Sequence, residues 1–111
     1  MSNSSDISDN LPVLMLNDNG VIHECNQACE KLFGYLSGEI LWKHISTLLP
    51  QLAGIALMTG TQINPRLHFL AHIGHHFEVV GLGGIHFASL LFINEVESMG
   101  QHYLRLIICP T

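Results

Sequence analysis

The sequence predicts an α+β domain in which two hairpin strands are followed by several short helices and then by three longer strands. Three observations support this order: a turn signal between two short apolar runs near the N-terminus, helical spacing of apolar residues from residue 26 onward, and period-two alternation near the C-terminus. The 111 residues, of which 48% are hydrophobic, suffice for one domain with a buried core. We expect residues 1–10, rich in Ser, Asn and Asp, to be a flexible lead-in and residues 11–111 to form the domain.

The first hairpin and the helix after it carry the clearest local signals. Residues 12–16 form an apolar run of strand length, and residues 17–20 read Asn-Asp-Asn-Gly, residue types that tolerate the positive φ of a tight turn. Residues 21–25 are then the returning strand. Asn26 stands where a helix N-cap belongs, and Gly34 is placed to end that helix.

The middle of the chain predicts short helical pieces. Residues 37–42 form one short helical segment, and residues 43–49 form a further one or two helical turns. Residues 51–58 are apolar and are interpreted as a short helix, which Gly54 weakens. Residues 59–64 are expected to be a loop.

Residues 65–74 fit either a helix or a strand. A helix would have Pro65 at its first position and would place Leu67, Leu70 and Ala71 on one face. The segment alternates poorly as a strand, so we interpret it as a helix.

The last third of the chain predicts three strands at residues 76–81, 85–97 and 101–109, joined by Gly-containing turns. In the final strand, large apolar residues at even positions alternate with residues that suit a partner surface at odd positions. The even positions are Leu104, Leu106 and Ile108.

Composition excludes some functions and favours others. The net charge of −5, with only four Lys and Arg, argues against nucleic-acid binding and against membrane-surface binding. Charged residues make up only 12%, so we expect the surface to rest on a second copy or on the remainder of a longer polypeptide. The N-terminus lacks the pattern of a signal peptide and the cysteine count is odd, which predicts reduced thiols and a cytoplasmic location.

Two groups of residues could hold a metal. Cys25 and Cys29 have the spacing of a zinc pair beside His23, but no second Cys pair follows, which favours Cys29 as a small buried residue. His68 and His72 would share a helix face at the four-residue spacing of paired metal ligands. The Glu that makes such a helix hydrolytic is missing between them. The alternative is that these histidines bind no cofactor.

Residues 26–50 carry two motifs. The first is an Asn-x-Ala helix that ends in Leu-Phe-Gly-Tyr, and its residues are Asn26, Ala28, Leu32, Phe33, Gly34 and Tyr35. The residues of the second are Glu39, Ile40, Leu41, Lys43, Ile45, Leu49 and Pro50. With these motifs the chain resembles the PAS domain, a sensory module of bacterial signalling proteins. The resemblance covers residues 12–111 and is most specific over residues 26–50, where Trp42 stands in place of the family's usual Gly.

The resemblance implies a five-stranded antiparallel sheet with short helices packed on one face, and a sensing rather than a catalytic role. It implies a homodimer and an attached output domain, such as a histidine kinase, a cyclic-di-nucleotide enzyme or a chemoreceptor. The candidate residues for a small-ligand pocket, which could equally be filled core, are Leu14, Leu48, Leu57, Phe69, Leu91 and Leu106.

Two alternatives stay open beside this sensory interpretation. One is a haem-based gas or redox sensor with His68 or His72 as axial ligand, and the other is a ligand-free dimerisation module. The light-sensing flavin subclass uses a helical Cys that residues 43–49 lack. The sensory interpretation predicts no cofactor, and the first alternative predicts haem.

Overall fold

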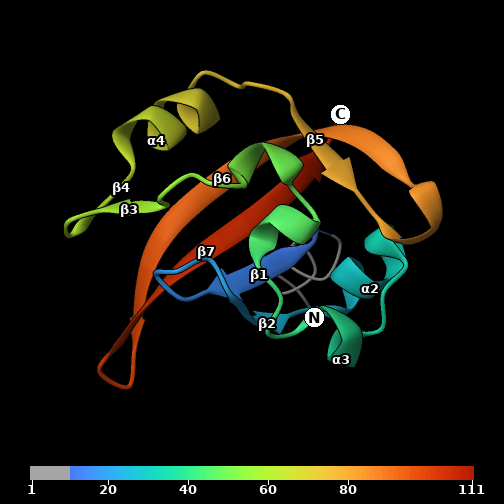
Figure 1. The fold of residues 1–111 in the computed structure, drawn as a ribbon, viewed down its shortest axis with the longest axis horizontal. Helices are drawn as coiled ribbons and strands as arrows, with labels where there is room; N and C mark the ends of the chain where they lie inside the picture. Colours follow the sequence, from blue (N-terminus) through green and yellow to red (C-terminus); the bar gives the residue numbers. More distant parts are fainter. Residues whose placement is uncertain (1–10) are drawn as a thin grey trace, which may run out of the picture.

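A computed structural model describes residues 11–111 as a five-stranded antiparallel sheet flanked by short helices (Figure 1). The elements in chain order are β1 (Val13–Leu16), β2 (Ile22–Cys25), α2 (Gln27–Phe33), α3 (Ser37–Ile40), the 3₁₀ helices η1 (Ile45–Thr47) and η2 (Pro50–Leu52), β3 (Met58–Thr59), β4 (Gln62–Ile63), α4 (Pro65–His72), β5 (Phe77–Val80), the 3₁₀ helix η3 (Leu82–Gly84), β6 (His86–Ser98) and β7 (Gln101–Pro110). The strand order β2-β1-β7-β6-β5 places the last strand at the centre. The predicted fold class is therefore confirmed, whereas the proposed lead-in, residues 1–10, lies outside the described residues.

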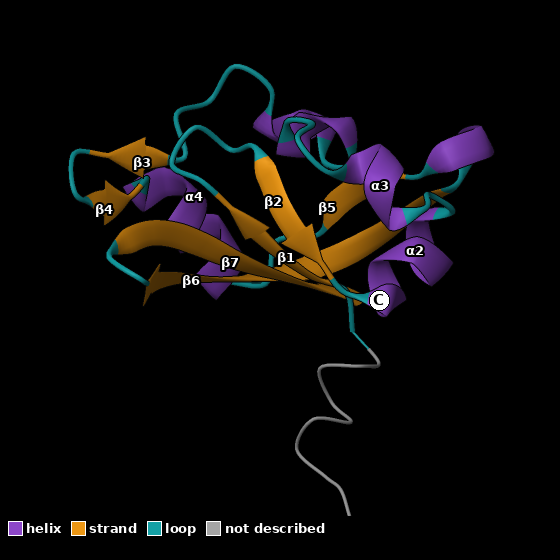
Figure 2. Cartoon of the chain, turned by 90° about the horizontal axis from the view of Figure 1, so that it is seen from below, coloured by secondary structure: helices purple, strands orange, loops and turns teal. Residues whose placement is uncertain are grey.

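The core lies between one face of this sheet and the short helices. Figure 2 shows α2 and α3 on the same side of the sheet. The even-numbered residues of β7 predicted to face the core, Leu104, Leu106 and Ile108, are indeed buried. The helical side contributes Phe33, Ile40, Ile45, Leu48 and Leu49. Among the described residues, no helix is both long enough and apolar enough to cross a lipid bilayer.

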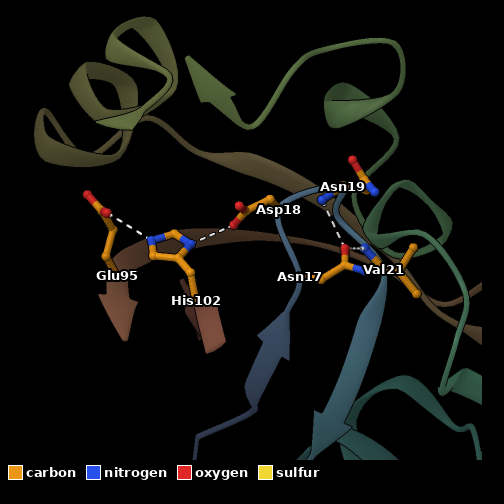
Figure 3. Close-up of polar contacts among 6 residues, drawn as sticks. All are labelled: Asn17, Asp18, Asn19, Val21, Glu95 and His102. Carbon is orange, nitrogen blue, oxygen red and sulfur yellow. Dashed lines mark hydrogen bonds and ion pairs between the residues drawn. The ribbon is translucent and has the colours of Figure 1, made fainter. Parts of the chain in front are cut away.

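The predicted first hairpin forms, and its turn is held by one side chain. Asn17 Oδ1 accepts hydrogen bonds from the backbone N–H of Asn19 at 2.9 Å and of Val21 at 3.0 Å (Figure 3). Gly20 takes φ +83°, in the left-handed region that glycine enters without steric cost. The turn sequence thus sets the register of β1 and β2 through local chemistry.

The first helix begins and ends as predicted, and the next helical segments are shorter than predicted. Asn26 caps α2 by accepting from Cys29 N, and Gly34 ends it with φ +79°. The helix predicted over 37–42 stops at Ile40, and Trp42 has φ +70°. The family's glycine at this position is explained by that φ, which a bulky side chain rarely adopts.

The helix predicted over 51–58 is wrong. Within that range only Gln51 and Leu52, the last two residues of η2, are helical, because Ala53 is extended and Gly54 takes φ +74°. The loop predicted over 59–64 is also wrong in part, since β3 and β4 form a two-stranded hairpin that turns at Gly60. The helix over 65–74 is confirmed as α4.

Candidate functional site

A cavity of about 310 Å³ lies between η2, the loop after it, α4 and β5. Its buried wall is apolar, and its rim carries four side chains with nitrogen or oxygen groups. The wall residues are Leu52, Leu67, Leu70 and Phe77, with the more exposed Ile55 beside them. The rim residues are Gln51, Asn64, Arg66 and His75. An apolar interior with a few polar groups is typical of a small-molecule site.

Local structure explains why two of the polar rim residues are fixed in place. Asn64 caps α4, since its Oδ1 accepts from Arg66 N at 2.9 Å and its Nδ2 donates to Ala56 O at 2.7 Å. Gln51 Oε1 accepts from the backbone N–H of Glu78 at 3.1 Å, which ties η2 to β5. Both amides are therefore part of the cavity's frame.

The pocket residues named from the sequence do not line this cavity. Five of them belong to the filled core, with exposed fractions of 3% or less: Leu14, Leu48, Leu57, Leu91 and Leu106. Phe69 is 59% exposed, so its assignment to an interior wall is wrong. The sequence did contain the signal, because Leu67 and Leu70 share a helix face whereas Phe69 is two residues from Leu67 and points about 200° away.

His68 and His72 share one side of α4, as their spacing predicts. They face an open groove of about 210 Å³ beside β6, together with Phe92 and Asn94. Both histidines are exposed, and the groove is smaller than the about 300–1,000 Å³ of ordinary ligand pockets. These residues do not fit an enclosed haem, and we derive no chemistry through that group.

Cys29 and His23 both have packing roles. Cys29 is buried, and its Sγ donates to Asn26 Oδ1 at 3.3 Å and to Val13 O at 3.5 Å. The pKa of Cys29 is raised to about 12, mainly by burial and secondly by the neighbouring Cys25. Its thiol is therefore a poor metal ligand at neutral pH. The His23 ring packs edge-on against Trp42 at 4.7 Å and Tyr103 at 5.7 Å. Across the described residues 11–111, no group of three or more His, Cys, Asp and Glu residues is arranged to hold a metal ion.

The comparison with known families decides the identity of the fold. No curated protein matches the chain. The family model described as the PAS domain matches residues 5–67, more than half of the chain. This chain belongs to the PAS domain family. The predicted resemblance is thereby confirmed.

Solved PAS domains share the fold at low sequence identity. The PAS domain of a Desulfitobacterium hafniense protein is 20% identical with a TM-score of 0.70, covering 92% of this chain and 93% of that one. The PAS domain of nitrogen regulation protein NR(II) from Vibrio parahaemolyticus is 20% identical with a TM-score of 0.65 and full coverage of both chains. A PAS domain from a two-component sensor histidine kinase is 11% identical with a TM-score of 0.71, covering 96% and 91%. These identities establish the shared fold alone.

One side-chain contact in this PAS domain was not predicted from the sequence. His102 lies between two carboxylates: its Nδ1 is 2.5 Å from Asp18 Oδ1, and its Nε2 is 3.0 Å from Glu95 Oε1 (Figure 3). The contact joins the β1–β2 turn to the β6–β7 hairpin across 84 residues of sequence, a separation that no local pattern reports. Two hydrogen bonds raise the pKa of His102 above its ordinary value: the bond to Glu95 has the larger effect and the bond to Asp18 the smaller.

We expect this contact to make stability depend on pH. A raised pKa in the folded state stabilises the protein below the unfolded value of about 6.5, and the effect is lost as the pH rises through the folded pKa. The stability advantage of wild type over His102→Gln should therefore be largest below about pH 6.5 and should shrink as the pH rises from there through the raised pKa of the folded state. Glu97, opposite His102 in the ladder, adds a third negative charge nearby.

Urea unfolding at several pH values would measure this advantage. In an Asp18→Asn background the pH-dependent part should be smaller, because one of the two carboxylates is gone. A difference between wild type and His102→Gln that stays constant across this range would contradict the assignment.

Proposed function

We propose that this PAS domain is a sensory and signal-relay module of a multidomain signalling protein, and that a small molecule enters the cavity beside α4. The observation that carries the proposal is the position of the cavity between two layers. Its wall joins the helical layer, through Leu52 and Leu67, to the main sheet, through Phe77. A ligand there contacts both layers at once and can favour one arrangement of them over another.

The sheet offers a direct route from the cavity to the end of the described chain. Phe77 on β5 pairs with Ser89 on β6, and Ser89 pairs in turn with Pro110 at the end of β7. Thr111 is held to the same region, since its backbone N–H donates to Ala88 O at 3.1 Å. A shift of β5 would therefore reach the C-terminal end of β7 across only two strand pairings.

Similar folds support an attached output domain, and the proposal includes a cytoplasmic location. The similar PAS domains include one from a sensor histidine kinase and one from a nitrogen regulation protein. PAS domains are sensory modules as a rule, so we assign no catalytic step to this chain. A histidine kinase, a cyclic-di-nucleotide enzyme or a chemoreceptor would each suit as the output domain.

The outer face of the sheet is the surface that we assign to a homodimer. Phe92, Ile107 and Val13 lie side by side across β6, β7 and β1 and point away from the core. Phe92 is 50% exposed, and Ile107 and Val13 are partly exposed. An apolar row across three strands, in a chain with 12% charged residues, favours a second apolar surface as its partner.

We expect Phe92→Glu to shift this dimer towards monomer by tenfold or more in dissociation constant, because the substitution places a charge in an apolar contact. Phe69→Glu is the matched control, since Phe69 is also a half-exposed phenylalanine but lies on α4. Sedimentation velocity over a concentration series would report both. A wild type that stays monomeric, or a stronger effect from Phe69→Glu, would reject this surface.

Native mass spectrometry tests the sensory function itself. A small molecule that remains bound to the folded chain, or that binds when added, supports sensing. A dimer that stays empty under every condition supports the alternative, a ligand-free dimerisation module.

A further inference from the structure

The charges around the cavity select for one kind of ligand. None of the nine lining residues is Asp or Glu, whereas Arg66 contributes a permanent positive charge and His75 an imidazole. The whole chain has only four Lys and Arg residues and a net charge of −5. One of these few cations therefore stands at the rim of the cavity with no carboxylate among its lining neighbours.

Arg66 is also available for binding. Its side chain makes no hydrogen bond or ion pair within residues 11–111, and its backbone N–H donates to Asn64 Oδ1. The guanidinium is exposed at the second residue of α4, so a ligand can reach it from solvent. By contrast, both amides on the rim are already hydrogen-bonded to the protein frame.

The interior of the cavity requires an apolar ligand body. Leu52, Leu67 and Phe77 are each less than 5% exposed and offer no hydrogen-bonding group. The His75 ring stands edge-on to Phe77 at 4.7 Å, which extends this surface towards the rim. A volume of about 310 Å³ lies at the lower end of the about 300–1,000 Å³ of ligand pockets, so the ligand is small.

We propose that the cavity binds a small amphipathic carboxylate, with its hydrocarbon part between Leu67 and Phe77 and its carboxylate paired with Arg66 at the rim. The inference rests on the proposed sensory function and adds the chemical class of the ligand. Arg and carboxylate form paired, parallel hydrogen bonds, so the geometry suits this anion. A cationic ligand would instead meet Arg66 with no negative group on the cavity wall to offset it.

Calorimetric titration with three six-carbon probes tests the proposal: hexanoate, hexanamide and hexylamine. Because the pair lies at an exposed rim, we expect hexanoate to bind about three- to tenfold more tightly than hexanamide, and hexylamine to bind least. The difference between hexanoate and hexanamide should fall with added salt. In Arg66→Gln that difference should disappear while hexanamide affinity stays within about twofold, since the apolar wall is unchanged.

Two further variants separate the possible failures. Lys43→Gln removes an exposed cation that does not line the cavity and should leave the preference for hexanoate intact. Leu67→Trp should fill the cavity and remove all binding. Equal affinity for hexanoate and hexanamide in the wild type, with both lost in Leu67→Trp, would overturn the carboxylate assignment and leave the sensory cavity standing. No binding of any probe, or binding unaffected by Leu67→Trp, would overturn both.

Discussion

Replacing Gly81 with alanine is expected to lower the free energy of unfolding by about 1–3 kcal/mol, the usual cost of forcing an extra methyl group into a packed interior. A Cβ atom at this position would lie 2.7 Å from the backbone oxygen of Phe33 and 3.1 Å from Ile85 Cβ. Gly81 itself has an extended backbone that any residue can adopt, so the cost is steric. Urea unfolding followed by circular dichroism would measure it.

Gly38 is the matched control for that substitution. A Cβ atom at Gly38 would have no heavy atom within 4 Å, and the residue lies inside α3. Gly38→Ala is expected to leave stability unchanged or raise it by up to about 1 kcal/mol, because alanine favours a helix over glycine. Equal losses in the two variants would show that the contact between Gly81 and Phe33 is not the cause.

The parts of the fold that the sequence predicted are those with local signals. The turn at Asn17 and Gly20, the cap at Asn26 and the end of α2 at Gly34 all depend on residues within a few positions of one another. The alternation in β7 likewise reports one face of one strand. Such features are visible in the sequence because the chemistry that fixes them is local.

The cavity could not be predicted in the same way, because its wall comes from three separate segments. Leu52, Leu67 and Phe77 meet only once η2, α4 and β5 have packed. The apolar run at 51–58 suggested a helix, but the residue that breaks it, Gly54, adopts a left-handed conformation that composition alone does not reveal. The contact between Asp18 and His102 depends likewise on the assembled sheet.

Asn26→Ala is expected to destabilise the domain by about 1–3 kcal/mol, because one side chain makes three hydrogen bonds that hold the start of α2 to residues 11–13. Asn26 Oδ1 accepts from Cys29 N at 3.3 Å, which caps α2, and from Val13 N at 3.1 Å, which fixes the start of β1. Its Nδ2 donates to Leu11 O at 2.9 Å. Alanine removes all these bonds and leaves the partly buried N–H groups without this acceptor.

Asn26→Asp tests which of those bonds matters. A carboxylate keeps an acceptor for Val13 N and Cys29 N and suits a helix N-terminus, but it cannot donate to Leu11 O. Its stability at neutral pH should therefore lie between those of the wild type and Asn26→Ala. Since a capping carboxylate has a lowered pKa, that advantage over alanine should be lost as the pH falls below about 4. If Asp is no better than Ala at pH 7, the bond to Leu11 O dominates and the helix cap contributes little. If Ala lies within about 0.5 kcal/mol of the wild type, Asn26 does not hold these segments together.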